Sequence, residues 1–219
     1  MSDKKLGFPQ HFFQKPNDSD IIWVTDFNSE AVIAFYEKFI ELEQRNDIQV
    51  IPVFINSYGG EIYALTAMRD LIKSSPKPVA TVGVGMAMSC GASLLAAGTK
   101  GFRFASENTH IMIHQVSGVA PGKSADILEY ASVISELNNG IISMLSSDSG
   151  SPITKLEKEI KKRNNADWTL SAQEAKKWGF IDSVGIPRSW TPPSPHTELI
   201  TVPTYAQLAA KKGLKPQKS

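Results

Sequence analysis

The feature of this sequence that most restricts its fold is an apolar run at 79–84 that leads within a few residues into a run of small ones at 90–97. The first run, VATVGV, is rich in β-branched residues and predicts a buried strand. A turn is predicted at 86–88, and the second run, CGASLLAA, predicts a short helix that Gly98 ends. Ser89 therefore lies where a strand passes into a helix, so that its hydroxyl is exposed beside unpaired backbone N–H groups of the first helical turn.

The chain before this segment repeats the order of strand and helix. Apolar runs at 21–24 and 50–55 predict two further strands. Pro52 would place the second of them near an edge or at a bulge of a sheet, because proline cannot donate to a ladder. Each strand precedes a pattern in which apolar residues recur every three or four positions, namely Val32, Phe35, Phe39 and Leu42, then Ala64, Ala67, Met68, Leu71 and Ile72. Near-continuous apolar strands that alternate with helices predict an α/β fold with a largely parallel sheet covered by helices.

A long helix is predicted from Ser124 to about Ser147. Its apolar residues, at steps of three and four, are Ile127, Tyr130, Ile134, Leu137, Ile141 and Met144. Such a seam can pack on a helix of another subunit or on the core of its own chain, and the periodicity does not choose between them. Residues 1–19 predict an N-terminal arm, 20–186 a single domain, and 187–219 a tail that contains Pro and Lys.

Composition narrows the classes of function. The 219 residues carry a formal net charge of +1, which gives no reason to expect nucleic acid or an anionic membrane as a partner. The single cysteine excludes an intramolecular disulfide, and no cofactor or metal ion is expected. The sequence has no run of about 18 apolar residues and no apolar leader, so the expected location is the cytoplasm.

The sequence offers two parts of an acyl-transfer site and several candidates for a third. A serine hydroxyl becomes a nucleophile when a neutral histidine takes its proton, and a carboxylate orients that histidine. His114 ends a short apolar run 25 positions after Ser89, although a histidine at a strand end can also be a core residue. His110 lies close by in sequence but lacks the same surroundings. The candidate acids are Asp126, Asp148, Asp167 and Asp182.

Three motifs, in this order along the chain, resemble the proteolytic subunit of the Clp protease family. Ile55–Gly60 (INSYGG) differs from a family motif only at Tyr58, where the family has Pro. Met88–Ala92 (MSCGA) matches the family's serine followed by a hydrophobic residue, Gly and Ala, and Met112–Gln115 (MIHQ) matches its histidine motif at the family's spacing. The similarity extends over residues 21–184.

The resemblance implies the α/β spiral of strand–helix units shared by Clp proteases and crotonases, with a long helix that protrudes as a handle. It implies a serine endopeptidase in which Ser89 is the nucleophile and His114 the base. The acid would be Asp167, three residues before a Leu-Ser-Ala segment, and the backbone N–H groups of Gly60 and Cys90 would form the oxyanion hole. The family also implies a homo-oligomer, a heptameric ring or a double ring (tetradecamer), which receives unfolded protein or peptide from an AAA+ unfoldase.

Some features depart from the family and keep other interpretations open. Asn165 and Ala166 stand where many members have an Asp-Arg pair that couples two rings, and Tyr58 is expected to alter the peptide-binding groove. The unusual arm and tail suggest a phage-type peptidase for capsid maturation, or one that works without an unfoldase. A non-catalytic structural ring subunit and a crotonase-type acyl-CoA enzyme are alternatives of another class, which the intact Ser-His-Asp set disfavours. Cys90 as the nucleophile is a further alternative, although adjacent residues at a helix start point about 100° apart.

Overall fold

The computed structural model describes residues 20–163, 167–187, 199–201, 204 and 207. The predicted arm, the departures at Asn165 and Ala166, and most of the predicted tail lie outside the described residues. Within the described part, no helix is long and apolar enough to cross a membrane.

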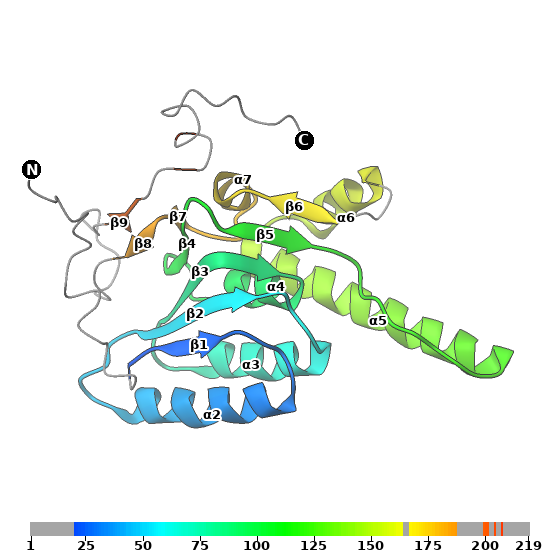
Figure 1. Ribbon diagram of the computed structural model, residues 1–219, viewed down its shortest axis with the longest axis horizontal. Coiled ribbons are helices and arrows are strands. Elements are labelled where there is room, and N and C mark those ends of the chain that lie inside the picture. Colours follow the sequence, from blue (N-terminus) through cyan, green and yellow to red (C-terminus); the bar gives the residue numbers. More distant parts are fainter. Residues whose placement is uncertain (1–19, 164–166, 188–198, 202–203, 205–206, 208–219) are drawn as a thin grey trace, which may run out of the picture.

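The fold is a largely parallel sheet with helices packed against it, as the alternation of strands and helices predicts (Figure 1). Five strands follow the order β1-β2-β3-β4-β7, and β5 and β6 extend the sheet from the far end of β3. The strands of this sheet are β1 (Ile22–Val24), β2 (Ile51–Ser57), β3 (Val79–Met88), β4 (Arg103–Ala105), β5 (His110–Ile113), β6 (Trp168–Leu170) and β7 (Ser183–Val184). A separate pair is formed by β8 (Ile186–Pro187) and β9 (Leu199–Ile200). The helices are α2 (Ser29–Gln44), α3 (Ile62–Ser74), α4 (Cys90–Ala97), α5 (Ser124–Ser149), α6 (Ile153–Lys162) and α7 (Ala172–Lys177).

The longest strand, β3, changes partners along its length. Up to Gly83 it pairs with β4, and from Met86 onward it pairs with β5. Gly85, whose φ is +76°, lies between the two stretches and allows the strand to bend there. The turn predicted at 86–88 is therefore wrong, because these residues continue the ladder and carry the chain to Ser89 beside β5.

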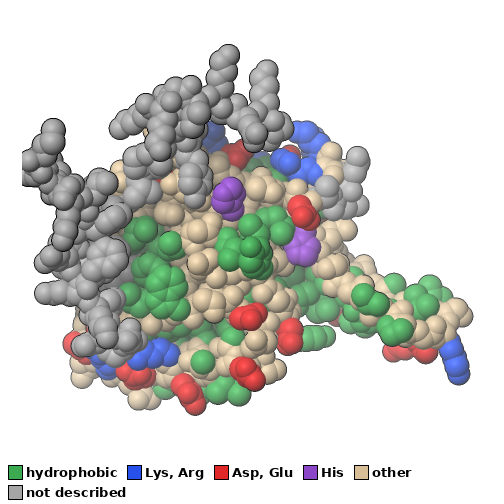
Figure 2. Space-filling model, in the orientation of Figure 1, with side chains coloured by type: hydrophobic (Ala, Val, Ile, Leu, Met, Phe, Trp, Pro, Cys, Tyr) green, Lys and Arg blue, Asp and Glu red, His purple; other side chains and the backbone are tan. Residues whose placement is uncertain are grey.

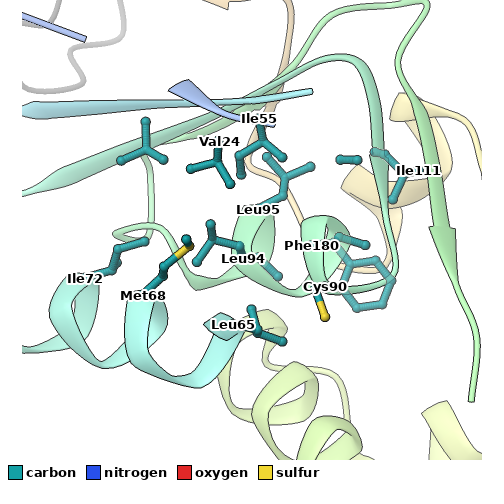
Figure 3. Packing of buried hydrophobic residues seen from close by; sticks show 14 of the residues in the cluster. Val24, Ile55, Leu65, Met68, Ile72, Cys90, Leu94, Leu95, Ile111 and Phe180 are labelled. Carbon is teal, nitrogen blue, oxygen red and sulfur yellow. The ribbon is translucent and has the colours of Figure 1, made fainter. Parts of the chain in front are cut away.

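The short helix α4 lies at the centre of the hydrophobic core, and all of its eight residues are buried. Figure 3 shows Leu94 and Leu95 pointing among side chains that come from α3 and from the strands. Gly98 ends the helix as predicted, but its φ of −53° is not left-handed. Glycine is needed there for close packing, since a Cβ would lie 2.3 Å from Thr81 Oγ1. The helix that begins immediately after Ser89 is thus held firmly on all sides.

The long helix α5 projects from the body of the molecule, and only its C-terminal part is packed (Figure 1). Its buried residues are Ile142 and Leu145. Apolar side chains nearer its N-terminus remain in solvent, among them Leu128, which is 71% exposed. The sequence left open whether the apolar seam of this helix packs on the chain's own core. The structure shows such packing only for the last turns of the helix.

Pro52 lies in β2, which is flanked by β1 and β3, so the expected edge position is wrong. The ladder with β1 begins with the pair Ile22 and Val53, one residue after the proline. The N–H of Ile51 donates to Pro78 O on the β3 side at 2.9 Å, so alternation turns the proline nitrogen toward the β1 side. Because β1 has not yet begun at this level, the missing donor removes no ladder bond.

Arg103 at the start of β4 is 2% exposed and ties three parts of the chain together. Its Nε and Nη2 donate to Asp182 at 2.8 and 2.6 Å, and Nη1 donates to the backbone carbonyls of Asp148 and Gly179, both at 2.8 Å. Burial alone would raise the pKa of Asp182, but the hydrogen bonds and charge of Arg103 outweigh burial and leave this pKa below its usual value. Asp182 is therefore engaged as the counter-charge of a buried cation.

We expect Asp182→Asn to destabilise the fold by about 3–5 kcal/mol, because Arg103 would stay buried without a counter-charge. The lowered pKa of Asp182 adds stability that is fully present above about pH 4, where an unfolded aspartate is ionised, and that is lost as pH falls through the lower folded value. Urea unfolding at pH 7 and in acid measures both effects. Asp47→Asn, which removes an exposed partner of Arg45, is the control and should change the midpoint little. Equal midpoints for the two variants would contradict the prediction.

Candidate active site

Ser89 occupies a strained turn between β3 and α4. Its φ of 55° and ψ of −118° make it the one non-glycine residue with positive φ in the described part of the chain. Such a conformation costs about 1–3 kcal/mol and is held only where the surroundings enforce it. Here its N–H donates to Met112 O of β5 at 2.7 Å, and the buried α4 follows directly. This strand–turn–helix geometry is the one that presents a nucleophilic hydroxyl at the end of a sheet.

The Gly59–Gly60 pair allows the loop after β2 to approach this turn closely. A Cβ on Gly59 would lie 2.7 Å from Ser89 Cβ and 3.1 Å from Ser89 Oγ, so a side chain there would collide with the serine. The φ of Gly59 is +107°, a further reason for glycine. Ser57 Oγ accepts a hydrogen bond from the Gly59 N–H at 3.0 Å and fixes the loop.

The backbone of Gly60 faces the serine. Gly60 forms a parallel bridge with Phe27, in which the next residue, Glu61, donates its N–H to Phe27 O at 2.8 Å. The N–H and C=O of Gly60 itself therefore point to the opposite side, where the carbonyl accepts a hydrogen bond from Cys90 Sγ at 3.3 Å. Cys90 begins α4, so its own N–H has no intrahelical partner. Two backbone donors are thus available next to Ser89 for a developing negative charge.

The Cys90 thiol has a packing role in this arrangement. The residue is 4% exposed, and its Sγ–H is directed at the Gly60 carbonyl. Burial raises the pKa of the Cys90 thiol, despite hydrogen bonds that oppose this change. A thiol of raised pKa stays protonated near neutral pH and is a poor nucleophile. These observations disfavour the alternative in which Cys90 attacks the substrate.

His114 follows β5 and lines the same pocket as Ser89. Asp167 directly precedes β6, which pairs with β5 in antiparallel register. The last pair of this ladder is Ile113 with Trp168, so one further step places His114 opposite Asp167. The sheet therefore brings the predicted serine and histidine into one pocket and sets the predicted acid beside the histidine.

Within the described chain, no hydrogen bond joins the side chains of Ser89 and His114 or those of His114 and Asp167. Asp167 is exposed and does not line the pocket. Catalytic hydrogen bonds are often long in free enzymes and shorten only when substrate binds, so the arrangement remains compatible with proton transfer.

The other candidate acids have partners elsewhere. Asp148 is almost fully buried and accepts from Arg69 at 2.9 and 3.0 Å and from Lys73 at 2.8 Å. Asp182 is bound by Arg103, and Asp126 accepts from the backbone N–H of Lys123, the residue that precedes α5. Of the four aspartates, only Asp167 directly precedes the strand that pairs with β5, the strand that His114 follows.

The pocket beside Ser89 has both apolar and polar walls, and the sequence did not identify the apolar ones. Its apolar lining consists of Ile62, Leu65, Ile113, Val116 and Ile141. These residues come from α3, the end of β5 and α5, three elements that meet only in the folded chain. One local indication of these walls was present in the sequence, because the apolar residue Ile62 stands only two positions after Gly60. Such a pocket can receive an apolar side chain next to the serine.

A comparison with protein families agrees with these elements. The model of a family described as Clp protease matches residues 11–188, which is most of the 219-residue chain. The matched region contains all of the residues that line the pocket, together with Asp167.

Proposed function

Because this chain belongs to the Clp protease family, we propose that it is a serine endopeptidase that hydrolyses peptide bonds through an acyl-enzyme. Ser89 is the nucleophile, His114 the base and then the acid, and Asp167 the carboxylate that orients the imidazole. The observation that carries the proposal is the strained Ser89, placed by β3 and α4 in one pocket with His114.

The proposed reaction uses the described groups in two steps. His114 takes the proton of Ser89 Oγ as this oxygen attacks the peptide carbonyl, and the resulting oxyanion accepts hydrogen bonds from the N–H groups of Gly60 and Cys90. The C–N bond then breaks, and His114 returns the proton to the leaving amine. Water, deprotonated by His114, attacks the ester carbonyl, and Ser89 is released with its proton restored. Peptides with an apolar residue on the acyl side of the cleaved bond should be preferred, because Ile, Leu and Val side chains form part of the pocket wall.

The family supports a ring assembly and a partner as further parts of the proposal. The exposed apolar side chains of α5 would be covered by the same helix of an opposing ring. A single or double heptamer would enclose the sites in the cytoplasm, and an AAA+ unfoldase would deliver unfolded chains. Negative-stain images would show whether a ring forms.

A fluorophosphonate probe tests the mechanism, since it acylates activated serines. We expect peptide mapping to locate the label on Ser89 of the wild-type protein. Asp167→Asn is expected to slow both labelling and peptide hydrolysis by about 10³–10⁴-fold, because the imidazole loses the carboxylate that fixes its tautomer. Asp126→Asn is the matched control, since that side chain caps α5, and its rates should stay close to wild type. Similar rates for the two variants would show that Asp167 is not the third member.

A further inference from the structure

Glu61 presents a carboxylate at the rim of the candidate active site. It directly follows Gly60, which lines the pocket together with Ser89, and it precedes the first residue of α3. Its side chain is exposed. Among the described residues, no hydrogen bond or ion pair involves this carboxylate, so it neither caps α3 nor neutralises a neighbouring cation. A charge in this position is available to a ligand of the site.

The side chain of Glu61 lies on a different face of the loop from the pocket. Gly60 and Ile62 both line the pocket, whereas Glu61 between them does not. The backbone groups of the two residues also differ in direction: the Gly60 C=O accepts from Cys90 Sγ, whereas the Glu61 N–H donates to Phe27 O. Glu61 has an extended conformation, with φ of −73° and ψ of 132°, and Ile62 begins α3, so the carboxylate stands at the entrance to the site but outside the pocket.

An extended peptide that is cleaved at Ser89 must run beside this segment. Its attacked carbonyl lies near the Gly60 N–H, and the side chain of the same residue enters the apolar pocket. In an extended chain the side chain of the preceding residue points to the opposite face. Peptides that add to an exposed edge place their alternate side chains in register with those of the edge. The side chain that precedes the cleaved residue therefore points away from the pocket, and Glu61 is an exposed carboxylate at the rim outside the pocket.

We propose that Glu61 selects peptides that carry Lys or Arg at the position immediately before the residue whose carbonyl is attacked. The inference rests on the proposed function and adds a substrate preference to it. Asp26 strengthens the negative charge of this rim, because it is adjacent to Phe27, the residue that bridges Gly60, and is itself exposed. Acidic side chains are visible over the lower part of the face in Figure 2, where α2 and α3 lie.

Two internally quenched peptides test the proposal. They are identical, with an apolar residue before the cleaved bond, except that the preceding position is Lys in one and Gln in the other. Mass spectrometry of the products confirms that both are cut at the same bond. We expect wild-type kcat/KM to favour Lys by about two- to five-fold, which is the range given by an exposed ion pair. The ratio should fall toward one in 1 M salt, where exposed charges are screened.

Variants assign the preference to Glu61. In Glu61→Gln the Lys-to-Gln ratio is expected to fall to about one at low salt, and in Glu61→Lys it should drop below one. Glu37→Gln removes an exposed carboxylate of α2 that does not line the pocket, and it should keep the wild-type ratio. A ratio that Glu61→Gln leaves unchanged, or a wild-type ratio of one, overturns this inference while peptide hydrolysis stands. Absence of hydrolysis of both peptides, together with absence of fluorophosphonate labelling, overturns the proposed function and this inference with it.

Discussion

Ser89→Ala is expected to lower kcat for peptide hydrolysis by about 10⁴–10⁶-fold, because the acyl-enzyme cannot form without the hydroxyl. The loss should appear in kcat with little change in KM, since the pocket walls stay in place. Stopped assays with a fluorogenic peptide measure the rate, and fluorophosphonate labelling measures the reactive serine separately. Circular dichroism should show an unchanged fold, because alanine removes one oxygen from a half-buried side chain.

Cys90→Ala separates the serine from its neighbour. This variant keeps the backbone N–H at the start of α4 and removes only the thiol, so Ser89 should still be labelled. Labelling that persists in Ser89→Ala and disappears in Cys90→Ala would show that the thiol is the nucleophile after all. Hydrolysis that survives in both variants would place the chemistry elsewhere in the molecule.

His114→Ala should cause a loss of similar size, about 10⁴-fold or more in kcat, because no other described side chain in the pocket can accept the serine proton. Labelling by the fluorophosphonate should fall with it, since the probe also requires an activated hydroxyl. The rates are compared at one pH and normalised to folded protein.

His110→Ala provides a matched control for this variant. Both histidines belong to the same short segment, and the two histidines of the described residues are visible on one face in Figure 2. His110 is exposed at the start of β5 and does not line the pocket. Its replacement should leave most of the activity. Equal losses in the two variants would mean that His114→Ala acts through the strand and not through its imidazole.

The sequence predicts those parts of the fold that depend on neighbouring residues. The apolar run at 79–84 and the small residues at 90–97 were sufficient to expect a strand and a helix on either side of Ser89. Local capping signals act over the same short range: Asn28 accepts from the N–H of Ala31 at the start of α2, and Ser171 and Glu174 form a capping box at α7. Each of these signals acts over a few residues, so a single sequence records it.

Features that depend on pairing across the chain were not predictable. The bend at Gly85 carries β3 from β4 to β5, and no local pattern distinguishes it from a turn. Pro52 is tolerated in an inner strand because β1 starts one residue later, a fact about register. The position of Asp167 beside His114 likewise arises from the β5–β6 ladder, so sequence alone left four aspartates as candidates until the family resemblance selected one. The catalytic roles remain predictions that the variants above decide.

The ladder that positions the site is not equally strong throughout. Ser89 follows β3, the strand with the most neighbours, and His114 follows β5, which pairs with β3. Asp167 depends on the three residues of β6, which pair with β5 alone among the described strands. Short outer strands fray before the centre of a sheet melts. Gentle heating should therefore abolish peptide hydrolysis reversibly, at temperatures below the onset of global unfolding as measured by calorimetry.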